Sequence, residues 1–533
     1  MRAKLGLTAL VVAVFTAAGL WHIRTDHAQA AAPVAPAGRP PHIRPDYSGI
    51  AIPPNIAPLN FRIEEPGAAF HVTIHGASGD AIEIDSKSSS IRIPGALWRS
   101  LLEANRGGTV SVDVSVAGEG GGITAFEPFT NTVADEAIDG YVAYRLMKPW
   151  YTLFGHIGLY QRNLEDFTET LILDNRDNEQ SCINCHSFAN YATDPMTVHV
   201  RFPFVMLVVD HGEVRRIDTR TDFNKAPFAY PAWHPGGRIG TYSVNKILQV
   251  FHAAGETRDA FDLSSDLVCY DLDRNTVFAT PAIADPARLE TFPAWSPDGR
   301  HLYFSSAPAL PDQAFAEYLR IQYDLVRVSF DVETGKWGGA ETVLAAADLG
   351  KSITAPRVSP DGRFVLFCGS DHGSFPIFQE GSDLYLLDLE TGHAGPLECN
   401  SDVTDAWHAW SSNGRWIVFS SKRLDKVFTR LFISYVDEDG HAHKPFLLPQ
   451  EDPEFYDGYL KLYNLPEFVK EPVRIRPRTL AEAILSKAEP RIAQLDPAVR
   501  SMLGLQGGPA SAEPDVSLWE VVEEDWSQPE QQE

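Results

Sequence analysis

The sequence predicts a mostly β protein in which an N-terminal β-sandwich is followed by a six-bladed β-propeller. Three observations predict it. Short segments near the N-terminus alternate apolar and polar residues, as half-buried strands do. Further along, one template recurs four times between residues 229 and 449. Within the copies lie strands that are apolar on both faces, and such strands need a sheet on either side.

Length and composition limit the classes of protein that fit. The 533 residues allow two to four compact units at roughly 150 residues each. Hydrophobic residues make up 44% and charged residues 22%, which excludes a disordered or collagen-like chain. The net charge of −26 repels nucleic-acid phosphates, so no nucleic acid is expected as a partner. Five cysteines are too few for a disulfide-built scaffold.

Residues 1–30 are predicted to be a signal peptide. Arg2 and Lys4 precede an apolar run over residues 5–20, and Ala28-Gln29-Ala30 is a small-residue cleavage site. We therefore expect the protein in the periplasm or at the extracytoplasmic face of the cell envelope. The alternative is a retained N-terminal anchor, because the apolar run is only a little shorter than a membrane span of about 20 residues. Residues 31–46 are rich in Ala and Pro and are predicted to be an extended linker.

Residues 47–149 are predicted to form the β-sandwich. Five segments have the apolar–polar alternation of half-buried strands: 61–63, 70–74, 82–84, 91–93 and 110–114. One helix is expected over residues 96–105, ended by Gly107-Gly108. The region holds no motif with a known chemistry.

Residues 150–450 are predicted to form the propeller. The four copies of the template occupy residues 230–237, 292–299, 355–362 and 407–414, and their fourth positions lie 62, 63 and 52 residues apart. Each copy is followed by further strands and a turn, so each is interpreted as one four-stranded blade. Hairpins within residues 154–172 and 196–217 are expected to supply two more blades.

The copies resemble the repeats of TolB-type six-bladed propellers. The segment Phe292-Pro-Ala-Trp-Ser-Pro-Asp-Gly299 carries the repeat's Pro-x-Trp-Ser-Pro-Asp-Gly pattern, and Asp383-Leu-Tyr385 matches its later Asp-Leu-Tyr. The resemblance covers about residues 229–449 and implies the fold. It says little about function, because such repeats occur in exported binding proteins and in peptidase-associated domains.

Residues 451–506 are predicted to be a C-terminal extension with short helices. One helix is expected to start at Thr479, with Thr479 and Glu482 as a capping box, and to stop at Pro490. Residues 507–533 hold eight acidic residues and no basic ones, which indicates a disordered acidic tail.

The main chemical motif is Cys182-Ile183-Asn184-Cys185-His186, the C-x-x-C-H sequence that attaches c-type haem. Two thiols at this spacing form thioethers with the porphyrin vinyl groups, and the adjacent imidazole is the proximal iron ligand. We expect one covalently attached haem c, held by Cys182 and Cys185 and ligated by His186, on a loop near residues 176–200.

Two other uses of Cys-x-x-Cys agree less well with this sequence. A thioredoxin-type disulfide opens a helix after a strand in a βαβ unit, and this part of the sequence shows no such alternation. Zinc needs four ligands, and the other cysteines lie 84 or more residues away. The predicted export also favours haem, since c-type attachment takes place outside the bacterial cytoplasm.

Three residues are candidates for the second, distal iron ligand. Met196 and His199 lie shortly after the motif, but in a strand they point to opposite faces, so at most one faces the iron. If they do not ligate iron, Met196 is expected to pack in the core and His199 to lie at the surface or at a blade edge. His408 replaces the proline of the other template copies and could reach a haem at the channel mouth, or it is simply hydrogen-bonded within its blade.

One C-x-x-C-H followed by TolB-like repeats resembles a group of exported bacterial mono-haem c-type cytochromes for which no activity is established. The likeness runs from residues 52–63 through residues 181–188 to residues 452–456. We expect electron transfer in the cell envelope with a periplasmic redox partner protein. The alternatives are an open iron that acts as a catalyst or a gas or redox sensor, and a propeller scaffold that binds a peptide or glycan. No hydrolase constellation can be assigned, so an enzymatic activity is neither predicted nor excluded.

Overall fold

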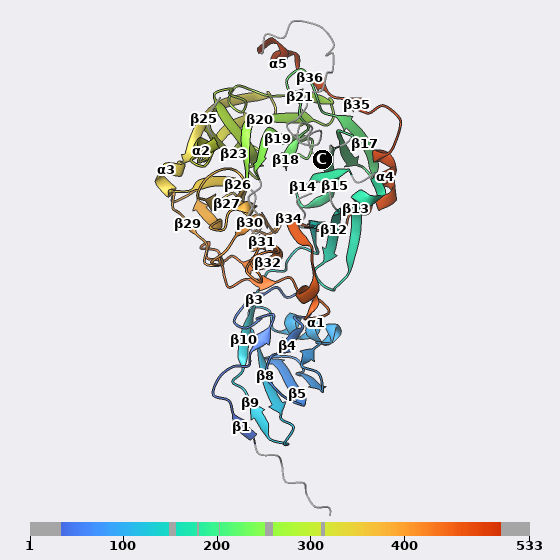
Figure 1. The fold of residues 1–533 in the computed structure, drawn as a ribbon, viewed down its shortest axis with the longest axis vertical. Helices are drawn as coiled ribbons and strands as arrows, with labels where there is room; N and C mark the ends of the chain where they lie inside the picture. Colours follow the sequence, from blue (N-terminus) through green and yellow to red (C-terminus); the bar gives the residue numbers. More distant parts are fainter. Residues whose placement is uncertain are drawn as a thin grey trace, which may run out of the picture.

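The computed structural model describes residues 34–148, 156–178, 181–201, 203–250, 259–310 and 315–502. The predicted signal peptide and the predicted acidic tail lie outside these residues. Figure 1 shows a ring of small sheets with a smaller β unit attached to its rim. In the described part of the chain, none of the helices has both the length and the apolar character needed to cross a membrane.

The smaller unit consists of two sheets and one helix. The larger sheet contains β1 (Val34–Pro36), β9 (Ile123–Ala125), β8 (Thr109–Ala117), β10 (Phe129–Val133), β3 (Ala51–Ile52), β5 (Ala69–Gly76) and β6 (Ile82–Ser86). The smaller sheet contains β2 (Ile43–Arg44), β4 (Phe61–Ile63) and β7 (Ser90–Ile91). Alternate residues of β8 are buried, as the sequence pattern predicts. Helix α1 (Gly95–Ala104) buries Trp98, Leu101 and Leu102.

The predicted linker is not a free spacer where the structure describes it. Strand β1 pairs with β9, and β2 pairs with β4, so parts of residues 34–46 belong to the sheets. Strand pairing uses backbone groups, and a composition poor in core-forming side chains therefore does not prevent it. The folded unit begins earlier than the sequence indicates.

The ring consists of six sheets, which define a β-propeller and are named blades 1 to 6 here. From the axis outward, blade 1 is β34 (Leu462–Val469), β11 (Tyr141–Met147), β12 (Ile157–Asn163) and β13 (Glu169–Asp174); blade 2 is β14 (Cys182–Ala189), β15 (Ala192–Arg201), β16 (Val205–Asp210) and β17 (Glu213–Asp218); blade 3 is β18 (Ala229–Trp233), β19 (Ile239–Val250), β20 (Asp259–Asp271) and β21 (Thr276–Phe278). Blade 4 is β22 (Arg288–Trp295), β23 (His301–Pro308), β24 (Asp324–Asp331) and β25 (Lys336–Leu344); blade 5 is β26 (Ser352–Val358), β27 (Phe364–Ser370), β28 (Asp383–Asp388) and β29 (Ala394–Pro396); blade 6 is β30 (Asp405–Trp410), β31 (Trp416–Ser421), β32 (Arg430–Tyr435) and β33 (Phe446–Leu447). The inner strands β14, β18, β22, β26, β30 and β34 are neighbours around the axis, and β34 contacts β14 to close the circle.

The chain segments on either side of the predicted propeller also belong to it. Strand β11 lies within the predicted sandwich region but forms blade 1 together with β34, which comes from the predicted C-terminal extension. Short strands β35 (Arg491–Ile492) and β36 (Gln494–Leu495) extend blades 2 and 3. The boundaries at residues 149 and 450 therefore do not separate the observed sheets, because blade 1 pairs strands from both ends of the ring.

The remaining helices are short: α2 (Phe315–Tyr318), α3 (Ala346–Leu349), α4 (Pro477–Ile484) and α5 (Pro497–Met502). Helix α4 begins before Thr479, with Arg476 at its N-cap and no side-chain capping bond, so the predicted capping box does not form. Pro477 sits in the first turn, where its fixed φ suits the start of a helix. The helix therefore starts earlier than predicted.

The recurring Ser-Pro-Asp-Gly segment is a turn held by its own side chains. Ser359 Oγ donates a hydrogen bond to Asp361 Oδ1 and accepts one from the Phe364 N–H at 2.9 Å. Ser296 and Ser411 make the same pair of bonds in blades 4 and 6. Gly362 ends the turn with a φ of 80°, a region that favours glycine. The template recurs because blades 4, 5 and 6 make the same connection between their first two strands.

Candidate functional site at the inner edge of blade 2

The C-x-x-C-H motif lies on β14, the innermost strand of blade 2. Strand β14 pairs with β15 over most of its length, and Cys182 lies opposite Arg201. The prediction of a haem-binding loop near residues 176–200 is therefore wrong in its conformation, because most of this segment is a β-hairpin. The motif occupies one copy of the propeller's repeating inner strand, and that repeat fixes its backbone.

The inner strands share a bulge, and the motif coincides with it. In five of them a non-glycine residue with positive φ interrupts the pairing: Tyr230 (46°), Phe292 (53°), Ala355 (51°), Trp407 (46°) and Leu465 (48°). In β14 the register shifts between Ile183 and His186. In every blade, the two residues that follow the bulge line one pocket at the propeller axis. When the inner strands are aligned on these two residues, Cys185 corresponds to Phe292 of blade 4 and His186 corresponds to Pro293. Two special positions of the propeller repeat thus carry the second cysteine and the histidine.

The residues at the first of these positions meet near the propeller axis. The ring centroids of Tyr230 and Phe292 are 4.3 Å apart, and those of Phe292 and Trp407 are 5.9 Å apart. Cys185 joins this cluster, because its Sγ accepts a hydrogen bond from the Tyr230 N–H at 3.4 Å. The second thiol therefore lies beside an aromatic cluster that fills the centre of the ring.

Both thiols of the motif are reduced and buried. Cys182 is 7% exposed and Cys185 is 2% exposed, and no disulfide joins them. Burial raises the pKa of both thiols, while the guanidinium groups of Arg145 and Arg201 act in the opposite direction. Sequence reasoning missed these two arginines, although strand pairing between β14 and β15 would have placed Arg201 opposite Cys182.

His186 is the most unusual side chain of the site. It is buried, and neither Nδ1 nor Nε2 has a hydrogen-bond partner among the described residues. Burial lowers its pKa to about 3, with a further contribution from the Arg145 guanidinium. The Phe188 ring contacts it edge-on, with a centroid distance of 5.7 Å. A buried polar group without a partner costs about 1–3 kcal/mol, so any group that binds this imidazole would stabilise the site.

Met196 and His199 point to opposite faces of β15, as their spacing predicts. Met196 is fully buried in the apolar cluster between blades 1 and 2, with Val198 and Val200. His199 faces blade 3, where its ring contacts Tyr242 at 5.3 Å. The surface or blade-edge position considered for His199 is wrong, because blade 3 covers the side chain. Both of its ring nitrogens are buried and lack a well-formed hydrogen bond among the described residues, and burial lowers its pKa to about 3 although the Cys185 backbone acts in the opposite direction.

His408 differs from His186 and His199 because both of its ring nitrogens have partners. Nε2 lies 3.1 Å from the Leu366 carbonyl oxygen, and Nδ1 lies 3.5 Å from the Cys368 Sγ. Both partners belong to β27 in the neighbouring blade 5. His408 thus ties two blades together, and it presents no spare nitrogen in this geometry.

The residue types at blade 2 are those that attach haem c, although both thiols are buried on a paired strand. The strand offers two free thiols at the required spacing and, next in sequence, an imidazole whose nitrogens have no hydrogen-bond partner among the described residues. Arg145 and Arg201 supply positive charge near the thiols, which suits the two propionates of a haem. Within the described ranges, no group of three or more His, Cys, Asp or Glu side chains is arranged to hold a metal ion. A haem does not need such a group, because the porphyrin supplies the equatorial nitrogens.

Comparison with known proteins gives only distant likenesses. No family model matches the sequence, and no curated protein matches it. Similar solved structures include an oligogalacturonate lyase from Vibrio parahaemolyticus, with 11% identity, a TM-score of 0.30 and coverage of 53% of this chain and 84% of the other. A hypothetical selenium-binding protein from Sulfolobus tokodaii has 9% identity, a TM-score of 0.36 and coverage of 77% and 96%. A nidogen/laminin complex has 10% identity, a TM-score of 0.36 and coverage of 62% and 100%.

Proposed function

We propose that the protein is an exported mono-haem c-type cytochrome that transfers electrons in the cell envelope. Cys182 and Cys185 would hold the haem c, and His186 would be its proximal ligand. The observation that carries the proposal is the buried His186 imidazole, which has no hydrogen-bond partner among the described residues and belongs to the same five-residue motif as two free thiols. A periplasmic redox protein is the proposed partner.

When bound, the haem supplies a one-electron iron couple. The chain's own residues would set the reduction potential of this couple by excluding water and by their charge. Ile183, Val198 and Val200 are buried, and an apolar surrounding disfavours the more highly charged oxidised iron. The positive charges of Arg145 and Arg201 would also disfavour the oxidised iron. These groups favour a raised reduction potential.

Met196 or His199 remains the proposed distal ligand. An absorption band at about 695 nm in the oxidised protein would identify methionine, and its absence from a low-spin spectrum would identify histidine. If carbon monoxide binds readily to the reduced protein, the iron is open, and electron transfer gives way to the catalyst or sensor proposal.

The test of attachment uses protein produced together with a cytochrome c maturation system. We expect a pyridine haemochrome spectrum typical of haem c and a mass greater than that of the polypeptide by one haem. In denaturant, three thiols should react with Ellman's reagent rather than all five cysteines. Colourless protein with the mass of the polypeptide and five reactive thiols would overturn the proposal.

Matched variants separate attachment from folding. Cys182→Ala together with Cys185→Ala should abolish covalent haem. Cys269→Ala changes an equally buried cysteine on β20 of blade 3 and should leave haem content unchanged. His186→Ala should lower haem retention or alter its spectrum, whereas equal loss of haem in the Cys269 variant would point to misfolding.

A propeller scaffold for a peptide or glycan is the second candidate. It is favoured by a pocket on the propeller axis that every inner strand lines. The pocket is separate from the thiols, so both functions can exist in one chain.

A further inference from the structure

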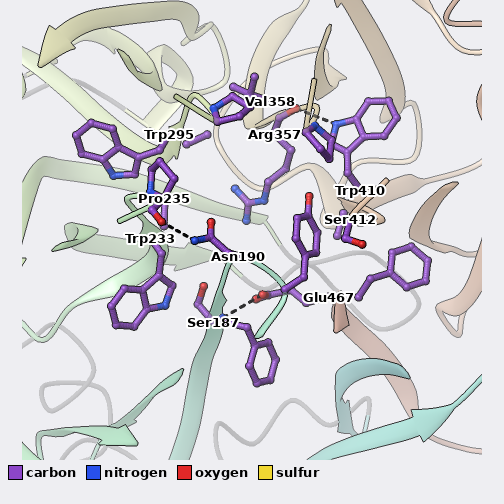
Figure 2. Close-up of a pocket in the computed structure, with 18 of the residues that line it drawn as sticks. Ser187, Asn190, Trp233, Pro235, Trp295, Arg357, Val358, Trp410, Ser412 and Glu467 are labelled. Carbon is purple, nitrogen blue, oxygen red and sulfur yellow. Dashed lines mark hydrogen bonds between the residues drawn. The ribbon is translucent and has the colours of Figure 1, made fainter. Parts of the chain in front are cut away.

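The axial pocket lies where the six inner strands end. Its cavity volume is about 340 Å³, within the roughly 300–1,000 Å³ of small-molecule sites. Each blade contributes the two residues after its bulge: Ser187 and Phe188, Ala232 and Trp233, Ala294 and Trp295, Arg357 and Val358, Ala409 and Trp410, Glu467 and Phe468. In Figure 2, Arg357 and Glu467 point toward the middle of the pocket from different blades. These six pairs include one charged residue of each sign, Arg357 and Glu467, and Lys470 also lines the pocket.

Arg357 reaches the pocket without a carboxylate partner. Its Nη1 donates to the Pro356 carbonyl oxygen at 3.1 Å, and no ion pair forms with it among the described residues. Burial lowers the pKa of this guanidinium, although arginine stays charged at neutral pH. The side chain is partly buried and forms no ion pair in the described part of the chain, so an anionic ligand would be favoured here.

Glu467 faces the same space from blade 1. Its Oε2 accepts a long hydrogen bond of 3.4 Å from the Phe188 N–H. Burial raises the pKa of this carboxyl to about 7, while Arg357 acts in the opposite direction. The two charges influence each other, and no ion pair joins them among the described residues.

Three tryptophans form much of the wall, and two of them are fixed in orientation. Trp295 Nε1 donates to Thr241 Oγ1 at 2.9 Å, and Trp410 Nε1 donates to the Arg357 carbonyl oxygen at 3.1 Å. Trp233 lines the pocket from blade 3. Fixed aromatic faces provide apolar contact area at a low entropic cost.

We propose that the axial pocket binds a small zwitterion, with its carboxylate on Arg357, its ammonium group on Glu467 and its apolar part against the tryptophans. A simple anion would face the Glu467 carboxylate, and a simple cation would face the Arg357 guanidinium. A molecule that carries both charges satisfies both groups. The inference does not depend on the haem, so it survives or fails separately from the proposed function.

Isothermal titration calorimetry at pH 8 tests the proposal with matched probes. L-leucine and 4-aminobutyrate carry both charges at short and long separation. Their carboxylate-only analogues are 4-methylpentanoate and butyrate, and their amine-only analogues are isoamylamine and butylamine. We expect at least one zwitterion to bind tenfold or more tightly than both of its analogues. Binding by neither zwitterion, or equal binding of an analogue, would overturn the proposal.

Variants identify the groups that bind. Arg357→Gln and Glu467→Gln should each weaken the zwitterion at least tenfold, and a folded Arg357→Lys protein should recover part of the affinity. Arg327→Gln removes an arginine that pairs with Glu341 on the outer strands of blade 4 and should leave the affinity unchanged. If Glu467→Gln leaves zwitterion binding unchanged, the site is a simple anion site and the proposal fails.

Discussion

Cys185 and His186 occupy positions where the other blades place a bulged residue and, in most cases, a proline. A proline there donates no backbone hydrogen bond, so the repeat already tolerates an interrupted ladder at this point. Substitution by cysteine and histidine therefore leaves the blade intact while it adds two reactive groups. His408 replaces the proline of blade 6 for the same reason, and its ring nitrogens contact residues of blade 5.

His408 predicts a pH dependence of stability. Burial lowers its folded pKa to about 3, whereas an unfolded histidine titrates near its ordinary value of about 6.5. Between these values the unfolded chain binds the additional proton, so stability is lost as the pH falls below about 6.5. One such group changes the free energy of unfolding by up to about 1.4 kcal/mol per pH unit.

Urea unfolding between pH 8 and pH 5 measures this effect. His408→Gln should be destabilised at pH 8 but should show a shallower loss of stability toward pH 5 than the parent protein. His393→Gln, at an exposed position, is the control and should keep the parent slope. A parent slope in His408→Gln would contradict the assignment.

The residue-scale predictions from sequence succeeded where they needed only local geometry. The opposite orientation of Met196 and His199 follows from the period of a strand, and the structure confirms it. The burial of His199 could not be predicted, because Tyr242 and Phe228 cover it from another blade. Arg357 and Glu467 escaped notice for the same reason: 110 residues separate them in sequence, and only ring closure brings them together.

At the scale of elements, the turn between the first two strands of a blade is the unit that recurs. In blade 5 the Ser359 hydroxyl bridges Asp361 and the Phe364 N–H. Ser359→Ala leaves that buried N–H without its partner and should cost about 1–2 kcal/mol of unfolding free energy. Chemical denaturation measures the loss.

Ser100→Ala is the control for the turn. Ser100 is exposed on α1 and bonds only the Ala96 carbonyl oxygen, so its removal should change stability by less than about 0.5 kcal/mol. Equal effects of the two substitutions would show that the turn bonds contribute little.

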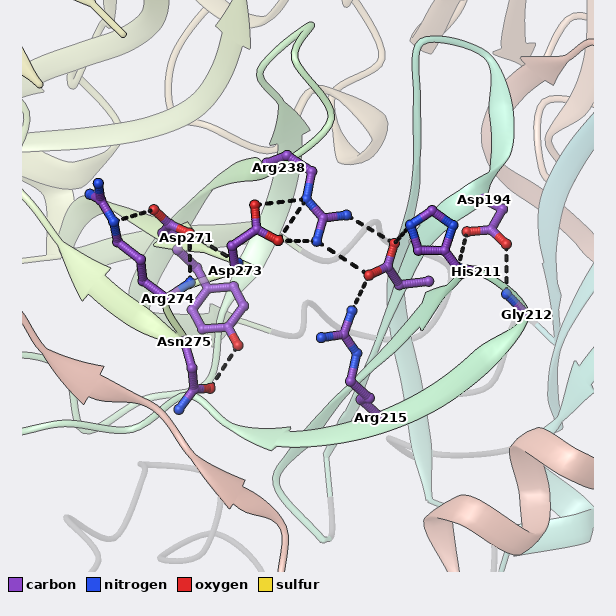
Figure 3. Close-up of polar contacts among 11 residues, drawn as sticks. Asp194, His211, Gly212, Arg215, Arg238, Asp271, Asp273, Arg274 and Asn275 are labelled. Carbon is purple, nitrogen blue, oxygen red and sulfur yellow. Dashed lines mark hydrogen bonds and ion pairs between the residues drawn. The ribbon is translucent and has the colours of Figure 1, made fainter. Parts of the chain in front are cut away.

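Ion pairs link blade 2 to blade 3. Arg238 of blade 3 pairs with Asp210 of blade 2 and with Asp273 of its own blade, and Figure 3 shows Arg238 beside Asp273. Its Nη1 lies 2.9 Å from Asp210 Oδ1, and this pairing holds the pKa of the Asp210 carboxyl below its usual value. Asp210 is 7% exposed, so the loss of its partner costs more unfolding free energy than the loss of a partner in an exposed pair.

Arg238→Ala should therefore lower the unfolding free energy by about 1 kcal/mol, since Arg238 itself is partly exposed and solvent screens its charge. The matched control is Arg274→Ala, whose pair with Asp271 spans 3.7 Å at an exposed arginine. Thermal melts should place the control within error of the parent. A stability loss in both variants, or in neither, would contradict the bridging role of Arg238.

For the whole molecule, the repeats were predicted from sequence but the closure was not. Four template copies predicted the blades, because each copy carries its own turn and inner strand. Blade 1 has no complete copy, since β34 and β11 are more than 300 residues apart in sequence and pair only across the ring. Pattern reasoning therefore placed β11 in the sandwich and β34 in an appended extension.

Strand β34 makes the ring a single cooperative unit, which a truncation can test. A chain that ends at residue 450 lacks β34, β35, β36 and α4, so blade 1 loses its inner strand and β14 and β30 lose their neighbour. Edge strands exposed on both sides of the gap would leave a large apolar surface in water. We expect this chain to aggregate, or to melt without a cooperative transition in circular dichroism. A chain that ends at residue 502 keeps every described strand and should melt as the full chain does. If the 450-residue chain melts cooperatively within a few degrees of the 502-residue chain, β34 does not hold the ring closed, and the propeller derives its stability from the contacts between blades alone.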